Sequence, residues 1–154
     1  MGFTSDFGIG FAARTAGLAL SAILLTAANT PSATLDVAIT GLRSTKGNVL
    51  ICVTANAKYF PNCSKDPLAH KRSVAAANAA MVQFNDMTPG TYAVGLIHDE
   101  NANKKLDVAI MIPREGFGFS RNPVITFGPP KFKAAAFSVG AGESLQGVKM
   151  KYML

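Results

Sequence analysis

The chain has 154 residues, with 15 Lys and Arg against 9 Asp and Glu, so its net charge is +6 at neutral pH. This length is typical of one domain, and a core of this size needs no metal or disulfide to fold. The basic residues are scattered, and no basic stripe interleaved with aromatic residues occurs. We therefore expect no nucleic-acid partner. An anionic envelope component is the candidate partner that the positive charge favours.

An apolar segment near the N-terminus predicts a signal peptide. Arg14 precedes residues 16–28, a run long enough for a signal-peptide core but shorter than the roughly 20 residues that span a bilayer. Thr26 and Ala28 supply the small residues that cleavage after Ala28 requires. We expect a helical Sec-type signal peptide at 1–28, a linker at 29–33 and one domain at 34–154. The mature protein is then periplasmic or secreted, without a transmembrane segment. A retained amphipathic helix is the alternative.

The two cysteines, Cys52 and Cys63, are predicted to form one disulfide. In an oxidising compartment an isolated pair usually closes a single bridge. Such a bridge ties a polar loop back to its own strand and contributes about 2–3 kcal/mol to stability. Two free thiols are the alternative.

Alternation of apolar and polar residues dominates the chain after residue 33. It predicts strands at 35–40, 48–54, 91–98, 134–139 and 145–154, with a weak strand and turn at 74–80. Residues 56–72 are predicted to be a polar loop, and residues 99–130 a long ordered loop. Short strands, frequent turn signals and no long amphipathic helix predict an all-β, single-domain antiparallel sandwich of about seven strands.

Residues 99–107, which we name the Asx loop, follow the predicted strand at 91–98. Side-chain oxygens occur at alternate positions in it, at Asp99, Asn101 and Asn103, and again at Asp107. Measured against the calcium-binding loop of helix-loop-helix proteins, these residues occupy positions 1, 3, 5 and 9. The backbone carbonyl of Lys105 falls at position 7 of the same template. This spacing suits a hard cation.

The Asx loop by itself does not supply a complete set of ligands for a cation. Lys104 stands where the template has Gly, and Ile110 stands where it has a bidentate Glu. Glu115 is the candidate that completes the shell once the chain folds back, with Glu100 as the other choice. We therefore expect weak calcium binding, on the order of 10⁻⁴ to 10⁻³ M. The alternative is a loop whose side chains accept hydrogen bonds from their own backbone amides.

Four segments together resemble the DUF2141 family: residues 89–94, 98–107, 112–120 and 128–137. Its members are exported bacterial proteins of unassigned function. The resemblance runs from about Leu35 to the C-terminus. It implies a small transthyretin-like or immunoglobulin-like sandwich and assigns no activity. Where the family loop has Asn-Gly-Lys, this chain has Lys104 directly after Asn103.

His98 lies an even number of residues from Tyr92, Val94 and Leu96, so its side chain is expected on the same face of the strand. This favours a buried, hydrogen-bonded histidine. We therefore expect a protein that is not an enzyme and has a binding or envelope-associated role. The alternative is a periplasmic hydrolase in which His98 works with Asp99, Glu115 or Ser120.

A glycine-rich segment gives a weaker ligand-binding hypothesis. Phe117, Phe119 and Ser120 lie among glycines that would let a ligand approach the backbone, and His98 would lie beside them. Packing of these aromatic rings into the fold is the alternative. A third hypothesis is a carrier of a small apolar ligand, which predicts a cavity lined by Phe117, Phe119 and Phe132.

Overall fold

The computed structural model describes residues 31–109, 112–126 and 128–154. The predicted signal peptide at 1–28 and residues 29–30 of the predicted linker lie outside these residues. The described strands are β1 (Ala33–Thr40), β2 (Asn48–Thr54), β3 (His70–Ala75), β4 (Met81–Met87), β5 (Gly90–Asp99), β6 (Val108–Ala109), β7 (Ile112–Pro113), β8 (Gly116–Phe119), β9 (Phe137–Val139) and β10 (Gly142–Lys149). Short helices occur at η1 (Cys63–Lys65), η2 (Ala76–Asn78) and α1 (Phe132–Ala135).

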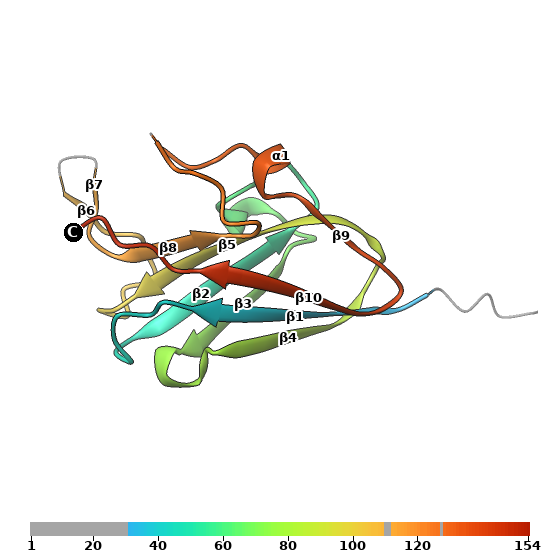
Figure 1. The fold of residues 1–154 in the computed structure, drawn as a ribbon, viewed down its shortest axis with the longest axis horizontal. Coiled ribbons are helices and arrows are strands. Elements are labelled where there is room, and N and C mark those ends of the chain that lie inside the picture. The colour runs from blue at the N-terminus through green and yellow to red at the C-terminus, as the bar shows by residue number, and fades with distance from the viewer. Residues whose placement is uncertain (1–30, 110–111, 127) are drawn as a thin grey trace, which may run out of the picture.

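Two sheets pack face to face, so the all-β sandwich predicted from the sequence is confirmed (Figure 1). The smaller sheet has the order β10-β1-β4, and the larger has the order β3-β2-β5-β8, with β9 pairing to the start of β5. Strands β6 and β7 form a separate short ladder. The pairings are antiparallel except that β10 runs parallel to β1, which departs from the expected fully antiparallel arrangement.

The main core lies between the sheets and is built from alternate residues of each strand. In β1 these are Leu35, Val37 and Ile39, and β2 and β5 contribute equivalent sets. Adjacent residues of a strand point to opposite faces, so apolar alternation in the sequence becomes one buried face per strand. This is why the strands at 35–40, 48–54 and 91–98 were predicted close to their observed bounds.

A second apolar cluster covers the outer face of the larger sheet. Ala93 and the rings of Phe117 and Phe119 lie on this face, and Ala135 of α1 packs over them. The rings of Phe60 and Phe132 add to the cluster, with Phe60 centred 5.8 Å from Phe119 and 5.9 Å from Phe132. The larger sheet is therefore buried on both faces around β5.

The C-terminal segment closes one side of the sandwich. Lys151 and Phe117 exchange backbone hydrogen bonds of 2.8 and 3.0 Å, which joins the end of the smaller sheet to β8. A side chain at Gly116 would collide with the ring of Tyr152, and one at Gly118 would lie 3.0 Å from Val148. The two glycines of β8 therefore serve the close approach of the two sheets.

Four local predictions were wrong in their details. Strand β3 begins at His70, inside the predicted polar loop, and residues 76–78 form a turn of helix. Strand β8 lies inside the region predicted to be a long loop. The predicted strand at 134–139 is divided into helix α1 and the short strand β9.

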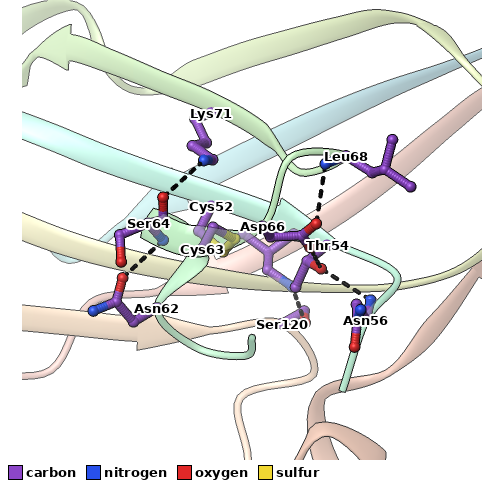
Figure 2. Close-up of a disulfide and its surroundings, with 11 residues drawn as sticks. Cys52, Thr54, Asn56, Asn62, Cys63, Ser64, Asp66, Leu68, Lys71 and Ser120 are labelled. Carbon is purple, nitrogen blue, oxygen red and sulfur yellow. Dashed lines mark hydrogen bonds between the residues drawn. A yellow bond between two sulfur atoms is a disulfide. The ribbon is translucent and has the colours of Figure 1, made fainter. Parts of the chain in front are cut away.

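The disulfide between Cys52 and Cys63 is confirmed, with the two Cα atoms 5.7 Å apart (Figure 2). It ties η1 to β2, as the sequence predicted. Among the described residues no helix combines the length and the apolarity needed to cross a bilayer.

Candidate functional site

The Asx loop begins where β5 ends. Asp99 is the last residue of β5 and is fully buried, and the turn before β2 packs directly over its backbone. A side chain at Gly47 in that turn, where φ is +66°, would collide with the backbone carbonyl of Asp99. The start of the loop is thus fixed by the sandwich, whereas residues 101–105 are exposed.

Asp99 is the anchor of the loop. Its Oδ1 accepts a hydrogen bond from the backbone N–H of Asn103 at 2.9 Å, and its Oδ2 accepts one from Lys104 at 2.7 Å. The loop therefore provides the polar partners that this buried side chain requires.

The remaining side chains of the Asx loop converge on Asp107. Asn101 Nδ2 donates to Asp107 Oδ2 at 2.6 Å, and Asn103 Nδ2 donates to Asp107 Oδ1 at 2.9 Å. The amide oxygens point to the loop backbone: Asn101 Oδ1 accepts from Asn103 N, and Asn103 Oδ1 accepts from Lys105 N. The four predicted residues are brought into one hydrogen-bonded network, and in this form the loop caps itself.

Two residues in the loop adopt left-handed backbone conformations. Ala102 has φ of +59° and Lys104 has φ of +62°. The sequence comparison with the calcium-loop template required this conformation at Lys104, where the template has Gly. A non-glycine residue pays about 1–2 kcal/mol for it. The hydrogen bond from Lys104 N to Asp99 offsets part of that cost.

Glu115 holds the two ends of the loop together. It is 4% exposed, and its Oε1 and Oε2 accept from the backbone amides of Glu100 at 3.1 Å and Asp107 at 3.0 Å. Arg114 N also donates to the carbonyl of Asp107 at 2.9 Å. Glu115 lies beside the loop, as predicted, and both of its carboxylate oxygens are occupied by backbone donors.

Arg43 and Glu100 form an ion pair next to the loop. The guanidinium group contacts both carboxylate oxygens, with Nη2 2.5 Å from Oε2 and Nε 3.1 Å from the same atom. The hydrogen bond from Arg43 lowers the pKa of Glu100, and Ser44 also donates to this carboxylate. Arg43 also donates to the carbonyls of Arg114 and Leu154. It thus connects the loop with the C-terminal segment.

His98 is a fully buried residue with both ring nitrogens hydrogen-bonded. Nε2 is 2.9 Å from the carbonyl of Lys46, which can only accept, so this nitrogen carries the proton. Nδ1 is 2.7 Å from the hydroxyl of Tyr152, and that hydroxyl accepts from Arg43 N at 3.1 Å. The predicted parity of His98 is thus correct, and the ring joins three segments of the chain.

Ser120 lies away from His98 and is fully buried. Its hydroxyl donates to the carbonyl of Ala135 and accepts from Val94 N at 2.9 Å. Gly116 is the residue paired with His98, so Ser120 lies four residues further along β8 and the turn that follows it. At about 3.3 Å per residue, the two side chains are more than 10 Å apart. The structure does not bring His98 and Ser120 together.

Phe117 and Phe119 are packed against other aromatic rings. Their own centroids are 5.8 Å apart, and Phe60 fills the space beside Phe119 and Phe132. The apolar cluster is thus occupied by side chains at the place where the carrier hypothesis requires a cavity.

Sequence reasoning missed Arg43 and Tyr152 as members of this region. Both are contributed by segments far from the Asx loop in the chain, and neither belongs to a motif. Their position depends on the C-terminal segment, which crosses over β8. The glycines at 116 and 118 are the feature of the sequence that could have indicated this close approach.

The donor set of the Asx loop consists of two carboxylates, two amides and the carbonyl of Lys105. Calcium takes six to eight oxygen ligands and accepts carboxylate, amide and backbone oxygens alike. Among the described residues no cluster of three or more His, Cys, Asp or Glu has the geometry of a metal site. Any cation at this loop would therefore depend on the amide oxygens of Asn101 and Asn103.

The comparisons with known proteins give a family and no activity. Searches of the curated proteins and of the solved structures found no match. Residues 37–146 match the model of the DUF2141 family, described as uncharacterized proteins conserved in bacteria. The matched region includes most of the sandwich and the whole Asx loop. The chain therefore belongs to the DUF2141 family.

Proposed function

We propose that this protein is an exported, non-enzymatic sandwich domain whose Asx loop binds calcium weakly, in a binding or envelope-associated role. The observation that carries the proposal is the convergence at Asp107, whose two oxygens lie 2.6 and 2.9 Å from the amide groups of Asn101 and Asn103. Rotation of each amide about its Cβ–Cγ bond places an oxygen where a nitrogen now lies. A cation would then replace the two N–H donors that face Asp107.

The charge of the loop explains why the binding is weak. Asp99 and Asp107 supply two negative charges, which balance a dication. Lys104 and Lys105 are exposed on the same loop and oppose it. Amide rotation also gives up the hydrogen bonds from Asn103 N and Lys105 N to the amide oxygens. In this proposal Glu115 holds the two ends of the loop through its hydrogen bonds from Glu100 N and Asp107 N, and it is not a ligand.

Three observations support a role without catalysis. Both nitrogens of His98 are engaged in hydrogen bonds, and so is the hydroxyl of Ser120. These two side chains are separated along the sheet. Both oxygens of Glu115 accept from backbone amides. A hydrolase needs a nucleophile and a base within hydrogen-bond reach.

Calcium titration of the purified protein by calorimetry tests the proposal. We expect one site with a Kd on the order of 10⁻⁴ to 10⁻³ M. At a calcium concentration ten times the Kd, binding stabilises the folded state by about 1.4 kcal/mol, which raises the melting temperature by a few degrees. Asp107→Asn keeps the shape of the side chain and removes one charge, so it should weaken binding about tenfold.

Glu143→Gln is the matched control, because Glu143 is exposed on β10 and its loss changes the net charge by the same amount. It should bind calcium like the unchanged protein, and magnesium at equal concentration controls for ionic strength. No heat and no rise in melting temperature at millimolar calcium would refute the proposal. The loop would then be the self-capped alternative.

A further inference from the structure

A surface hollow lies over the outer face of the larger sheet, in the loop that follows β2. It has a volume of about 370 Å³ and is lined by residues 58–62 with Ser64 and Lys65. In the pairing of β2 with β5, Asn48 lies opposite Asp99 and Thr54 lies opposite Ala93. The hollow follows the Thr54 end of β2, so it is independent of the Asx loop. We name it the lysine hollow.

The wall of the lysine hollow is held in place by several contacts. The ring of Phe60 is inserted between Phe119 and Phe132, and Pro61 packs against Gly95, where an added Cβ would lie 3.0 Å from the Pro61 carbonyl. Asn62 Oδ1 accepts from Ser64 N at 2.9 Å, and the disulfide at Cys63 fixes the next turn (Figure 2). A binding wall that is already ordered loses little entropy when a ligand binds.

The hollow carries a positive charge that no carboxylate of the described chain neutralises. Lys58 and Lys65 are both exposed, whereas the salt bridge found among the described residues joins Arg43 to Glu100 beside the Asx loop. Asp66 is the nearest acid in sequence, but it is 3% exposed and accepts from Thr54 and Leu68 N. Lys58 Nζ lies 5.7 Å from the ring centroid of Tyr59, which places a cation beside an aromatic surface.

We propose that the lysine hollow binds an acidic polysaccharide. Lys58 and Lys65 would pair with uronate carboxylates, Tyr59 would contact a sugar ring, and the amide of Asn62 would bond to hydroxyl groups. The volume is at the lower end of the range for small-ligand sites, about 300–1,000 Å³, so the hollow takes a short segment of a chain.

The shape of the surface favours a glycan over a lipid bilayer. Lipid-binding patches usually gather about four to eight Lys and Arg on a surface that can lie flat on the membrane. Here Lys58 and Lys65 line a shallow hollow together with Tyr59, and Lys71 Nζ lies 3.4 Å from the carbonyl of Ser64 beside it. The proposal also gives a location to the anionic envelope component that the charge of the chain predicts.

Binding of an oligogalacturonate hexamer to the purified protein, measured by calorimetry at low ionic strength with a chelator present, tests this site. The chelator makes the result independent of calcium at the Asx loop. Replacing both Lys58→Gln and Lys65→Gln should weaken binding about tenfold or more, as expected when two close charge pairs are lost. The matched control is Lys46→Gln with Lys149→Gln, two exposed lysines outside the hollow, and it should change the Kd less than about twofold.

Further measurements distinguish an acidic glycan from an anionic lipid as the ligand. Tyr59→Ala should weaken binding while the melting temperature shows that the protein is folded, and amide shifts on titration should gather at residues 58–65. Absence of binding to the hexamer would overturn the proposal. An equal loss of affinity in the control variant would also overturn it, as would equal affinity for a neutral maltohexaose. Stronger binding to phosphatidylglycerol vesicles that depends on the same two lysines would overturn it as well.

Discussion

Asp66 shows how one residue outside the candidate sites couples the fold to pH. Its carboxylate is 3% exposed and accepts hydrogen bonds from the hydroxyl of Thr54 and from Leu68 N (Figure 2). The hydrogen bond from Thr54 lowers the pKa of Asp66 below its ordinary value. The ionised form is thus favoured in the folded state. The contribution of this carboxylate to the free energy of unfolding is fully present above about pH 4, the ordinary pKa of an aspartate. It is lost as the pH falls through the lower pKa that Asp66 has in the folded state.

Thr54→Val tests this coupling, because it removes the hydroxyl and retains the volume of the side chain. The variant should be less stable than the unchanged protein at pH 7, and the difference in unfolding free energy should shrink as the pH falls below about 4. Urea unfolding at several pH values measures this. Thr54→Ser keeps the hydroxyl and is the control. A difference that stays constant with pH would show that the hydrogen bond to Asp66 is not its cause.

Gly116 and Gly118 illustrate how a residue type alone leaves its role open. In the sequence, two glycines beside two phenylalanines suggested that a ligand approaches the backbone. In the structure, the ring of Tyr152 and the side chain of Val148 occupy that space. Glycine permits close approach of any partner. The partner here is the other sheet.

The element that the disulfide holds is the short helix η1, and through it the wall of the lysine hollow. Cys63 is buried, and the bridge spans a sequence separation of 11 residues. In the loop after Thr54 the hydrogen bonds are local: Tyr59 N donates to the carbonyl of Asn56, and Lys58 N donates to Asn56 Oδ1. The order of this loop therefore depends on the bridge and on the packing of Phe60.

Replacing both cysteines, Cys52→Ser with Cys63→Ser, should lower the free energy of unfolding by about 2–3 kcal/mol, since the open loop gains entropy in the unfolded state. Urea unfolding of the variant measures the change, and reduction of the unchanged protein should give a similar loss. If the variant is as stable as the oxidised protein, then packing of the aromatic cluster alone orders the loop.

Strands β3 and β8 are among the elements that the sequence did not predict correctly. Strand β3 is an edge strand with exposed Lys71, Arg72 and Ser73, so it shows no clear alternation of apolar residues. Charged residues on an edge also discourage pairing with other chains. Strand β8 has two glycines in four residues, and glycine is depleted in strands. Both strands exist because their neighbours, β2 and β5, offer backbone partners.

At the scale of the whole molecule, the two candidate sites are formed by different loops of the sandwich. The Asx loop, β6, β7 and the C-terminus lie at one end (Figure 1). The loop that forms the lysine hollow leaves β2 at Thr54 and folds back over the outer face of the larger sheet, where Pro61 contacts Gly95. The two sites share no residue, and the calcium and glycan titrations are therefore expected to be independent.

Export is a prediction about the whole chain. Expressed with its own N-terminus in a bacterium, the protein should reach the periplasm or medium and begin at Asn29, because cleavage follows Ala28. Mass spectrometry of the purified product determines the start. Ala28→Leu places a large residue at −1 and should leave the segment attached. Recovery of the unprocessed chain in the cytoplasm would contradict the predicted signal peptide.

The sequence by itself determined the sandwich, the disulfide and the buried state of His98. Each depends on a local rule: alternation within one strand, two cysteines in an oxidising compartment, or the parity of a residue among its neighbours. The tertiary structure alone decided what surrounds each site. The contacts of Arg43 and Tyr152 join segments distant in the chain, and the wall of the lysine hollow is held by packing of Phe60 and Pro61 on Phe119 and Gly95. No periodicity records such contacts, because they depend on which strand ends meet when two sheets pack.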